Sequence, residues 1–220
     1  MIMIVATGLI IFAVGWAQYR NGMFTSCTML ISVLIAGLVA FELFEPIADV
    51  MDVSFQNGAL AGCEDFIVIM LLFCPTLYGL RWASNYLAPE MLDAHGALQY
   101  FGAGAVGLFT GYLLGGFLIC ATQTLPLDVR FLDFEPRETG EAGYRSIFPG
   151  DRVWLALMQH AGDKPFKWKD DPSTDPPQPL TFDRSSTFEL RYLRHRRSSE
   201  ARPPIPYTGE FDQELSKKPR

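Results

Sequence analysis

The first 125 residues of this 220-residue chain contain almost no positive charge. Arg20 and Arg81 are the two basic residues in this part, against eight acidic ones, whereas the last 95 residues contain sixteen of each sign. The stretches 1–19 and 21–41 contain no charged residue at all. A helix of about 20 residues rises about 30 Å, the thickness of the apolar core of a bilayer. This distribution argues against a single water-soluble domain and predicts a membrane domain over residues 1–127, followed by a polar tail over residues 128–220.

Sequence signatures of catalysis and of bound metal are also missing. The four cysteines do not have the spacing of metal ligands. The three histidines have no Ser or Cys nucleophile signature near them, and the sequence contains no glycine-rich phosphate loop. Ionisable residues are absent from the middle of the apolar runs, where ion-coupled transporters place them. We therefore expect a protein that is not an enzyme, that holds no cofactor and no metal, and that has no nucleic-acid partner.

Four apolar runs predict transmembrane helices at residues 2–19, 22–44, 60–87 and 97–125. The first two runs are separated by the letters "YRNG". Arg20 belongs at the membrane surface, because an Arg at the bilayer centre costs about 2.5–3.5 kcal/mol. Asn21 and Gly22 tolerate the positive φ of a tight turn. The predicted fold class is an all-α membrane protein with four transmembrane helices in two hairpins and a mostly irregular polar C-terminal tail.

The segments outside the four runs give weaker patterns. Residues 45–58 are acidic with apolar residues three and four apart, which predicts an interfacial amphipathic helix or a loop over the helix ends. In the tail we expect a short amphipathic helix at 151–161 with Asp151 as its N-cap, and a Pro-rich segment at 163–181 that is extended or disordered. Phe188, Leu190 and Tyr192 alternate with charged residues in the pattern of a short strand.

A cluster of arginines in the tail is a candidate contact for anionic lipid headgroups. A basic residue near such a surface contributes about 1 kcal/mol. A solvated tail segment is the alternative for these residues. The cluster consists of Arg191, Arg194, Arg196 and Arg197.

Small residues recur every four positions along the fourth run, at Ala103, Gly107, Gly111 and Gly115. Such a stripe lets another backbone approach closely, so that packing drives association where the hydrophobic effect cannot. Two interpretations stay open: the stripe packs inside the four-helix bundle, or it forms an oligomer seam or the lining of a pore.

Two stretches resemble the colicin V production protein (CvpA) family of bacterial inner-membrane proteins. "GWAQYRNGMF" is similar to the family's first hairpin turn at Gly15, Arg20 and Gly22, with Asn21 inserted. "LDAHGALQYFGAGAVGLFTGYLLGGFLI" is similar to its glycine-rich fourth span, although Gln99 and Tyr100 stand where the family usually has an Arg. The resemblance covers residues 1–127. It implies four spans and a role in colicin V secretion or envelope homeostasis, and it implies no catalytic residue.

The orientation follows from the few basic residues near the spans. If Arg20 and Arg81 lie in the cytoplasm, both termini, the acidic segment and the tail lie outside, which is an N-out/C-out topology. Arg130, Arg137 and Arg145 follow the last span closely and favour the opposite orientation.

Two functions follow as hypotheses. The first is a non-enzymatic scaffold or assembly factor in the inner membrane, with the bilayer, further copies of itself or other envelope proteins as partners. The second is a small channel or transporter subunit with an oligomeric pore, lined by the face of Gly107, Gly111 and Gly115.

Overall fold

A computed structural model describes residues 2–55, 63–87, 97–125, 150–163, 170–171 and 178–179, together with Phe188 and Tyr192. These residues are almost wholly helical. The elements are α1 (Ile2–Asn21), α2 (Met23–Phe55), α3 (Glu64–Leu87), α4 (Ala97–Gln123), α5 (Gly150–Asp163), β1 (Asp170–Asp171) and β2 (Gln178–Pro179). The two strands form an antiparallel pair in which Asp170 lies opposite Pro179.

Three helices are long and apolar enough to cross a membrane. The qualifying segments are Met23–Glu45 in α2, Glu64–Leu87 in α3 and Gln99–Gln123 in α4, of 23, 24 and 25 residues. An all-α architecture with three helices of the length and apolarity of membrane spans is therefore confirmed. Helix α3 continues through Pro75, the residue inside it that lacks a backbone N–H.

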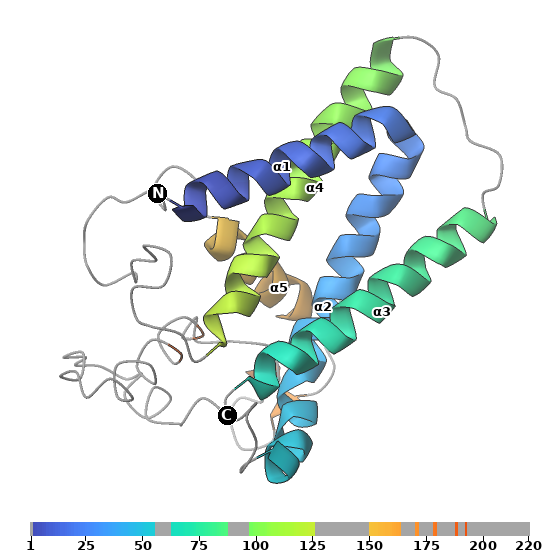
Figure 1. The fold of residues 1–220 in the computed structure, drawn as a ribbon. Helices are drawn as coiled ribbons and strands as arrows, with labels where there is room; N and C mark the ends of the chain where they lie inside the picture. Colours follow the sequence, from blue (N-terminus) through green and yellow to red (C-terminus); the bar gives the residue numbers. More distant parts are fainter. Residues whose placement is uncertain are drawn as a thin grey trace.

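The expected pairing of the helices in two hairpins is not confirmed. Helix α1 packs mainly along α4, α2 packs mainly along α3, and α2 also packs against α4 (Figure 1). Helices α1 and α2 diverge from their connection, and α3 and α4 touch little. The reason for the first divergence lies in the connection, because Gly22 alone separates α1 from α2. Antiparallel helices that lie side by side need a loop of about 2–5 residues.

The turn between α1 and α2 depends on the backbone of Gly22. Its φ of +87° lies in the left-handed region that favours glycine. Ser26 closes the turn on the α2 side: its backbone N–H donates to the Gly22 carbonyl at 3.1 Å, and its hydroxyl donates to the same carbonyl at 2.9 Å. The turn thus ends α1 at Asn21 and begins α2 at Met23.

Several predicted boundaries differ from the structure. Helix α2 runs without a break to Phe55, so the segment expected at 45–58 does not form a separate helix over the part that the structure describes. The change from apolar to acidic residues at Glu42 alters the surface of the helix, but no Gly or turn pair stops it before Phe55. Helix α5 begins at Gly150, which places Asp151 inside its first turn instead of at the N-cap.

Two parts of the tail bear on the predictions for it. Four residues of the segment 163–181, for which the sequence predicts extended or disordered chain, form the extended β1–β2 pair. Phe188 and Tyr192 are helical, so the expected strand is wrong at these positions. The spacing of 188 and 192 places both residues on one helix face, which the alternation with charged neighbours obscured.

Candidate functional site

The small-residue stripe of α4 lies against α1. A Cβ on Gly111 would lie 2.8 Å from the Cα of Ile11, and a Cβ on Gly107 would lie 2.6 Å from the Cβ of Gln18. A Cβ on Gly115 would lie 3.2 Å from a methyl of Thr7. Three positions on α4 therefore touch α1 along its length from Thr7 to Gln18. We call this contact the glycine seam; its fourth small residue, Ala103, is fully buried.

Gly15 belongs to the glycine seam and not to the turn. A Cβ on Gly15 would lie 2.6 Å from a methyl carbon of Leu108, and the Gly15 Cα already lies 3.2 Å from where a Cβ of Gly107 would stand. Arg20 and Asn21 are exposed at the end of α1, and Gly22 makes the turn. Four residues are expected at the connection between α1 and α2. Three of them lie there, whereas Gly15 lies about two turns of α1 before it.

Gln18 links the glycine seam to the turn. Its side chain is buried, although it is polar. The Ser26 hydroxyl lies 3.4 Å from the Gln18 backbone carbonyl and 3.5 Å from its side-chain oxygen Oε1. Other hydroxyls in the spans donate to carbonyls of their own helix: Thr28 to Thr25 at 2.9 Å and Thr110 to Val106 at 2.8 Å. These two hydroxyls are therefore satisfied by their own helix, as Ser and Thr in membrane helices can be.

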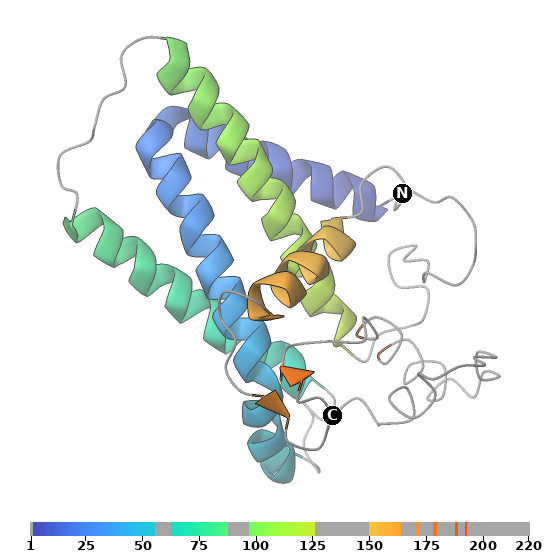
Figure 2. The same cartoon turned by 180° about the vertical axis from the view of Figure 1, so that it is seen from behind.

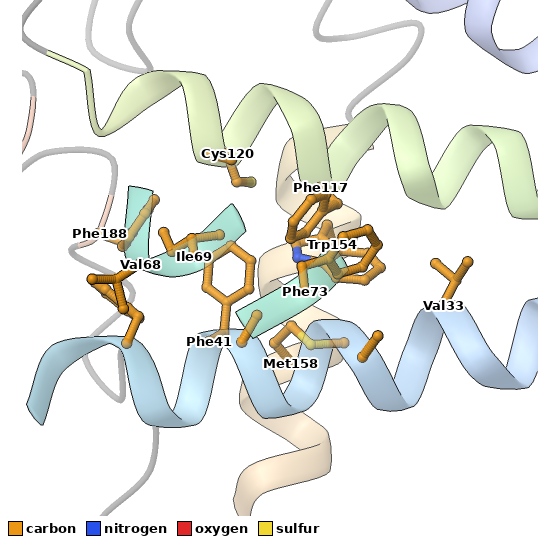
Figure 3. Packing of buried hydrophobic residues seen from close by; sticks show 14 of the residues in the cluster. Val33, Phe41, Val68, Ile69, Phe73, Phe117, Cys120, Trp154, Met158 and Phe188 are labelled. Carbon is orange, nitrogen blue, oxygen red and sulfur yellow. The ribbon is translucent and has the colours of Figure 1, made fainter. Parts of the chain in front are cut away.

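A second site joins the tail to the membrane helices, and we call it the tail junction. Aromatic rings from three helices and the tail meet there (Figure 3). Phe73 of α3 stacks on Phe117 of α4 with ring centroids 3.9 Å apart. Phe41 of α2 lies edge-on to Phe117 at 5.9 Å. The junction thus holds α2, α3 and α4 together at one level of the bundle.

The tail supplies the remaining rings of the tail junction. Trp154 of α5 lies edge-on to Phe117 with centroids 5.5 Å apart, and Phe188 lies edge-on to Phe41 at 5.9 Å. Both side chains are fully buried. Aromatic pairs of this geometry contribute about 0.5–1.5 kcal/mol each beyond the burial of their area. Described residues that follow α4 in the chain therefore form part of the hydrophobic core.

Two glycines make room for Trp154. A Cβ on Gly37 of α2 would overlap the six-membered ring of its indole. A Cβ on Gly116 of α4 would lie 3.2 Å from the Cβ of Trp154 and would overlap the Gly150 carbonyl oxygen. Among the described residues the Trp154 N–H has no hydrogen-bond partner, and it lies among aromatic rings instead (Figure 3). N–H groups make weak favourable contacts with aromatic faces.

A buried hydrogen bond fixes the far end of the tail junction. The Tyr192 hydroxyl donates to Oδ2 of Asp65 at 2.6 Å, across 127 residues of sequence. Asp65 and Glu64 are both buried in the first turn of α3, where the helix dipole favours negative charge. A hydrogen bond to a charged group contributes about 1.5–3 kcal/mol. The pairing of Tyr192 with Asp65 is thus a strong constraint on where the tail docks.

Helix α5 has a further contact with α4 at its start. The thiol of Cys120 donates a weak hydrogen bond to the Asp151 backbone carbonyl at 3.5 Å. The Asp151 carboxylate accepts a hydrogen bond from the Arg152 backbone N–H at 2.9 Å. The sequence identified Asp151 as a capping residue and gave no sign of this α4 contact.

Exposed aromatic residues mark the opposite end of the bundle. Tyr19 in the last turn of α1 meets Tyr100 in the first turn of α4, with ring centroids 5.7 Å apart. Trp82 stacks on Tyr86 near the end of α3, at 5.8 Å. Arg20 is exposed beside Tyr19. Trp and Tyr residues with a nearby Arg are typical of the membrane–water interface.

The part of the chain that the structure describes contains no group of three or more metal-ligating side chains. Arg191, Arg194, Arg196 and Arg197 lie outside the described residues. The sequence analysis did not predict the tail junction. It assigned Phe188 and Tyr192 to a strand, although their spacing of four residues is also that of two residues on one face of a helix.

No protein-family model, curated protein or solved structure matches the chain.

Proposed function

We propose that this chain is a multi-pass protein of the bacterial inner membrane that serves as a non-enzymatic scaffold or assembly factor. The colicin V production proteins that it resembles suggest the setting, which is support of toxin secretion or of envelope homeostasis. The partners of such a scaffold are the bilayer and either further copies of the chain or other envelope proteins.

The tail junction is the observation that carries this proposal. Trp154, Phe188 and Tyr192 are buried among the membrane helices, so the tail is attached to the bundle at defined points. A tail that is held in this way presents its remaining surface in a fixed position. Fixed presentation is what a scaffold needs, because binding to a preorganised surface loses less entropy.

A fourth span, α1, is part of the proposal. Its 20 residues include a single charged residue, Arg20, at one end. Its outward face is apolar: Val5, Leu9 and Phe12 are 65%, 66% and 67% exposed. Lipid is the environment that tolerates a continuous apolar face of this kind.

The topology that we propose is N-out/C-out. The hydrogen bond between Tyr192 and Asp65 supports a tail on the same side of the membrane as the α2–α3 connection. The contact of Thr7 with Gly115 supports an N-terminus near the C-terminal end of α4, which is the end that leads into the tail. The short-loop arginines Arg20 and Arg81 then face the cytoplasm.

The structure gives the channel hypothesis no support at the face on which it relied. Gly107, Gly111 and Gly115 are covered by α1 of the same chain, so this face lines no path in the described structure. A partner of the scaffold therefore meets another face.

The proposal is tested in a bacterial strain from which the gene that encodes this protein has been deleted. We expect the wild-type chain to restore resistance to detergents and secretion of colicin V. A Trp154→Ala variant, which releases α5 from the bundle, inserts into the membrane but does not restore either property. Val153→Ala, which removes an outward-facing neighbour, is the matched control and restores both. Full rescue by Trp154→Ala, at a membrane level equal to wild type, refutes the role of the docked tail.

The orientation is tested separately with two reporters fused after Arg220, one active only in the periplasm and one only in the cytoplasm. We expect activity from the periplasmic reporter alone. Activity of the cytoplasmic reporter reverses the proposed topology and removes the orientation that the colicin V resemblance implies.

A further inference from the structure

Helix α5 crosses two membrane helices instead of standing away from them. Figure 2 shows α5 lying across α2 and α4, with its axis steeply inclined to both. Its first residue, Gly150, packs on Gly116 of α4, and its Trp154 ring packs on Gly37 of α2. Since α2 and α4 cross the membrane in the proposed arrangement, a helix laid across both of them runs close to the membrane plane.

The contacts of α5 also give its depth. The apolar segment of α2 begins at Met23, and Gly37 lies 14 residues further on. This separation corresponds to about 21 Å along the helix. The apolar segment of α4 begins at Gln99, and Gly116 lies 17 residues further on, a separation of about 26 Å along the helix. The apolar core of a bilayer is about 30 Å thick. Counted from the tail-side ends of the same segments, Glu45 and Gln123, the two contacts lie about 11–12 Å inward. Helix α5 is therefore about 4–12 Å from the tail-side boundary of that core, close to the depth of interfacial amphipathic helices.

A stripe of two polar residues and one small residue lies on the outward face of α5. Arg152, Ala156 and His160 follow one another at intervals of four residues, and all three are exposed. The inward face consists of Trp154 and Met158, which are buried in the tail junction. Within the described residues no carboxylate pairs with the Arg152 guanidinium. A guanidinium at this depth avoids the hydrocarbon by extending toward the headgroups.

We propose that the stripe of Arg152, Ala156 and His160 binds the phosphate groups of anionic phospholipids in the tail-side leaflet. The guanidinium of Arg152 offers a planar fork of donors that matches a phosphate, and the imidazole of His160 offers a further N–H donor. The small side chain of Ala156 leaves the space between them open. The two polar residues are separated by about 12 Å along the helix, so the stripe contacts neighbouring headgroups and not one.

The inference rests on the proposed membrane insertion of α2 and α4, and that premise is measured first. Membranes that contain the full chain are washed with alkaline carbonate. Retention in the membrane fraction satisfies the premise. Release of the chain refutes both the proposed function and this inference, whereas a retained chain without lipid preference refutes the inference alone.

The binding experiment uses the full chain purified in a neutral detergent. Phosphatidylglycerol, phosphatidylcholine and inorganic phosphate are titrated in turn, and the lipids retained per chain are counted by native mass spectrometry. We expect phosphatidylglycerol to bind more tightly than phosphatidylcholine. Arg152→Gln weakens phosphatidylglycerol binding about fivefold, the factor that corresponds to about 1 kcal/mol for a basic residue at a lipid surface. Arg152→Lys, which keeps the charge but lacks the fork of donors, binds phosphatidylglycerol more tightly than Arg152→Gln and less tightly than the wild type.

Val153→Gln is the matched control, because it places the same side chain at the adjacent exposed position. We expect this variant to bind both lipids as the wild type does. Equal binding of the two lipids by the wild type overturns the inference, as does an equal loss in Arg152→Gln and Val153→Gln. Displacement of phosphatidylglycerol by inorganic phosphate at the same phosphate concentration assigns the site to free phosphate and overturns the lipid as its ligand. A thermal transition unchanged in Arg152→Gln shows that the variant is folded.

Discussion

Replacing Gly111 by alanine is expected to disrupt the contact between α1 and α4. The added Cβ would lie 2.8 Å from the Ile11 Cα and 3.0 Å from the Ile11 carbonyl oxygen. Both are backbone atoms, so no side-chain rotation relieves the clash. An ordinary contact of 3.4 Å requires α1 and α4 to separate locally by about 0.6 Å. A gap of this size removes about a quarter to a half of the attraction between facing atoms.

The expected loss of stability for Gly111→Ala is about 1–3 kcal/mol, the range for overpacking in a well-packed interior. Gly8→Ala is the matched control, because a Cβ on Gly8 meets nothing within 4 Å. This change is expected to be neutral or to stabilise α1 slightly, since alanine is favoured over glycine in helices by about 1 kcal/mol.

The assay is unfolding in mixed micelles with rising SDS, followed by circular dichroism, on wild type and both variants. The midpoint of Gly111→Ala should fall to a lower SDS fraction, while that of Gly8→Ala stays or rises. If the two variants unfold at the same SDS fraction, the close approach of α1 to α4 is not what stabilises this pair of helices.

Three further predictions concern the tail junction. Tyr192→Phe removes the hydrogen bond to Asp65 and should destabilise the docked tail by about 1.5–3 kcal/mol; limited proteolysis should then cleave the tail faster than in wild type, and an unchanged rate contradicts this. Trp154→Ala empties the centre of the junction and should cost about 3–5 kcal/mol in thermal unfolding, against less than about 0.5 kcal/mol for Val153→Ala. Gly37→Ala should be destabilising alone but nearly silent in a Trp154→Ala background, because the clash needs the indole ring; additive losses would argue against that contact.

The membrane helices were predictable because each is a local property of the chain. Length and the absence of charge identify a span without reference to its neighbours, and the predicted 60–87 and 97–125 lie close to the observed Glu64–Leu87 and Ala97–Gln123. The turn at Gly22 was equally local, since it depends on one residue that adopts positive φ. The small-residue stripe was visible as well, but the sequence left open which helix covers it.

The partners of the helices were not predictable in the same way. The pairing of α1 with α4 depends on Gly15 opposite Gly107, a complementarity between residues far apart in the chain. The tail junction shows the same limit, because Gly37 is a space for Trp154 that neither local pattern reveals. Phe188 and Tyr192 were misread since their charged neighbours imitate the alternation of a strand.

The position of the tail junction in the chain has a consequence for biosynthesis. Trp154, Phe188 and Tyr192 follow α4 in the sequence, so the ribosome completes them after all the membrane helices. Until then Phe41 lacks the ring of Phe188, and Phe117 and Gly37 lack the ring of Trp154. The core of this bundle is therefore closed last, by residues that follow all the long apolar helices. A chain that stops before residue 192 has these helices but not the complete core, and its uncovered aromatic surface distinguishes it from a mature molecule.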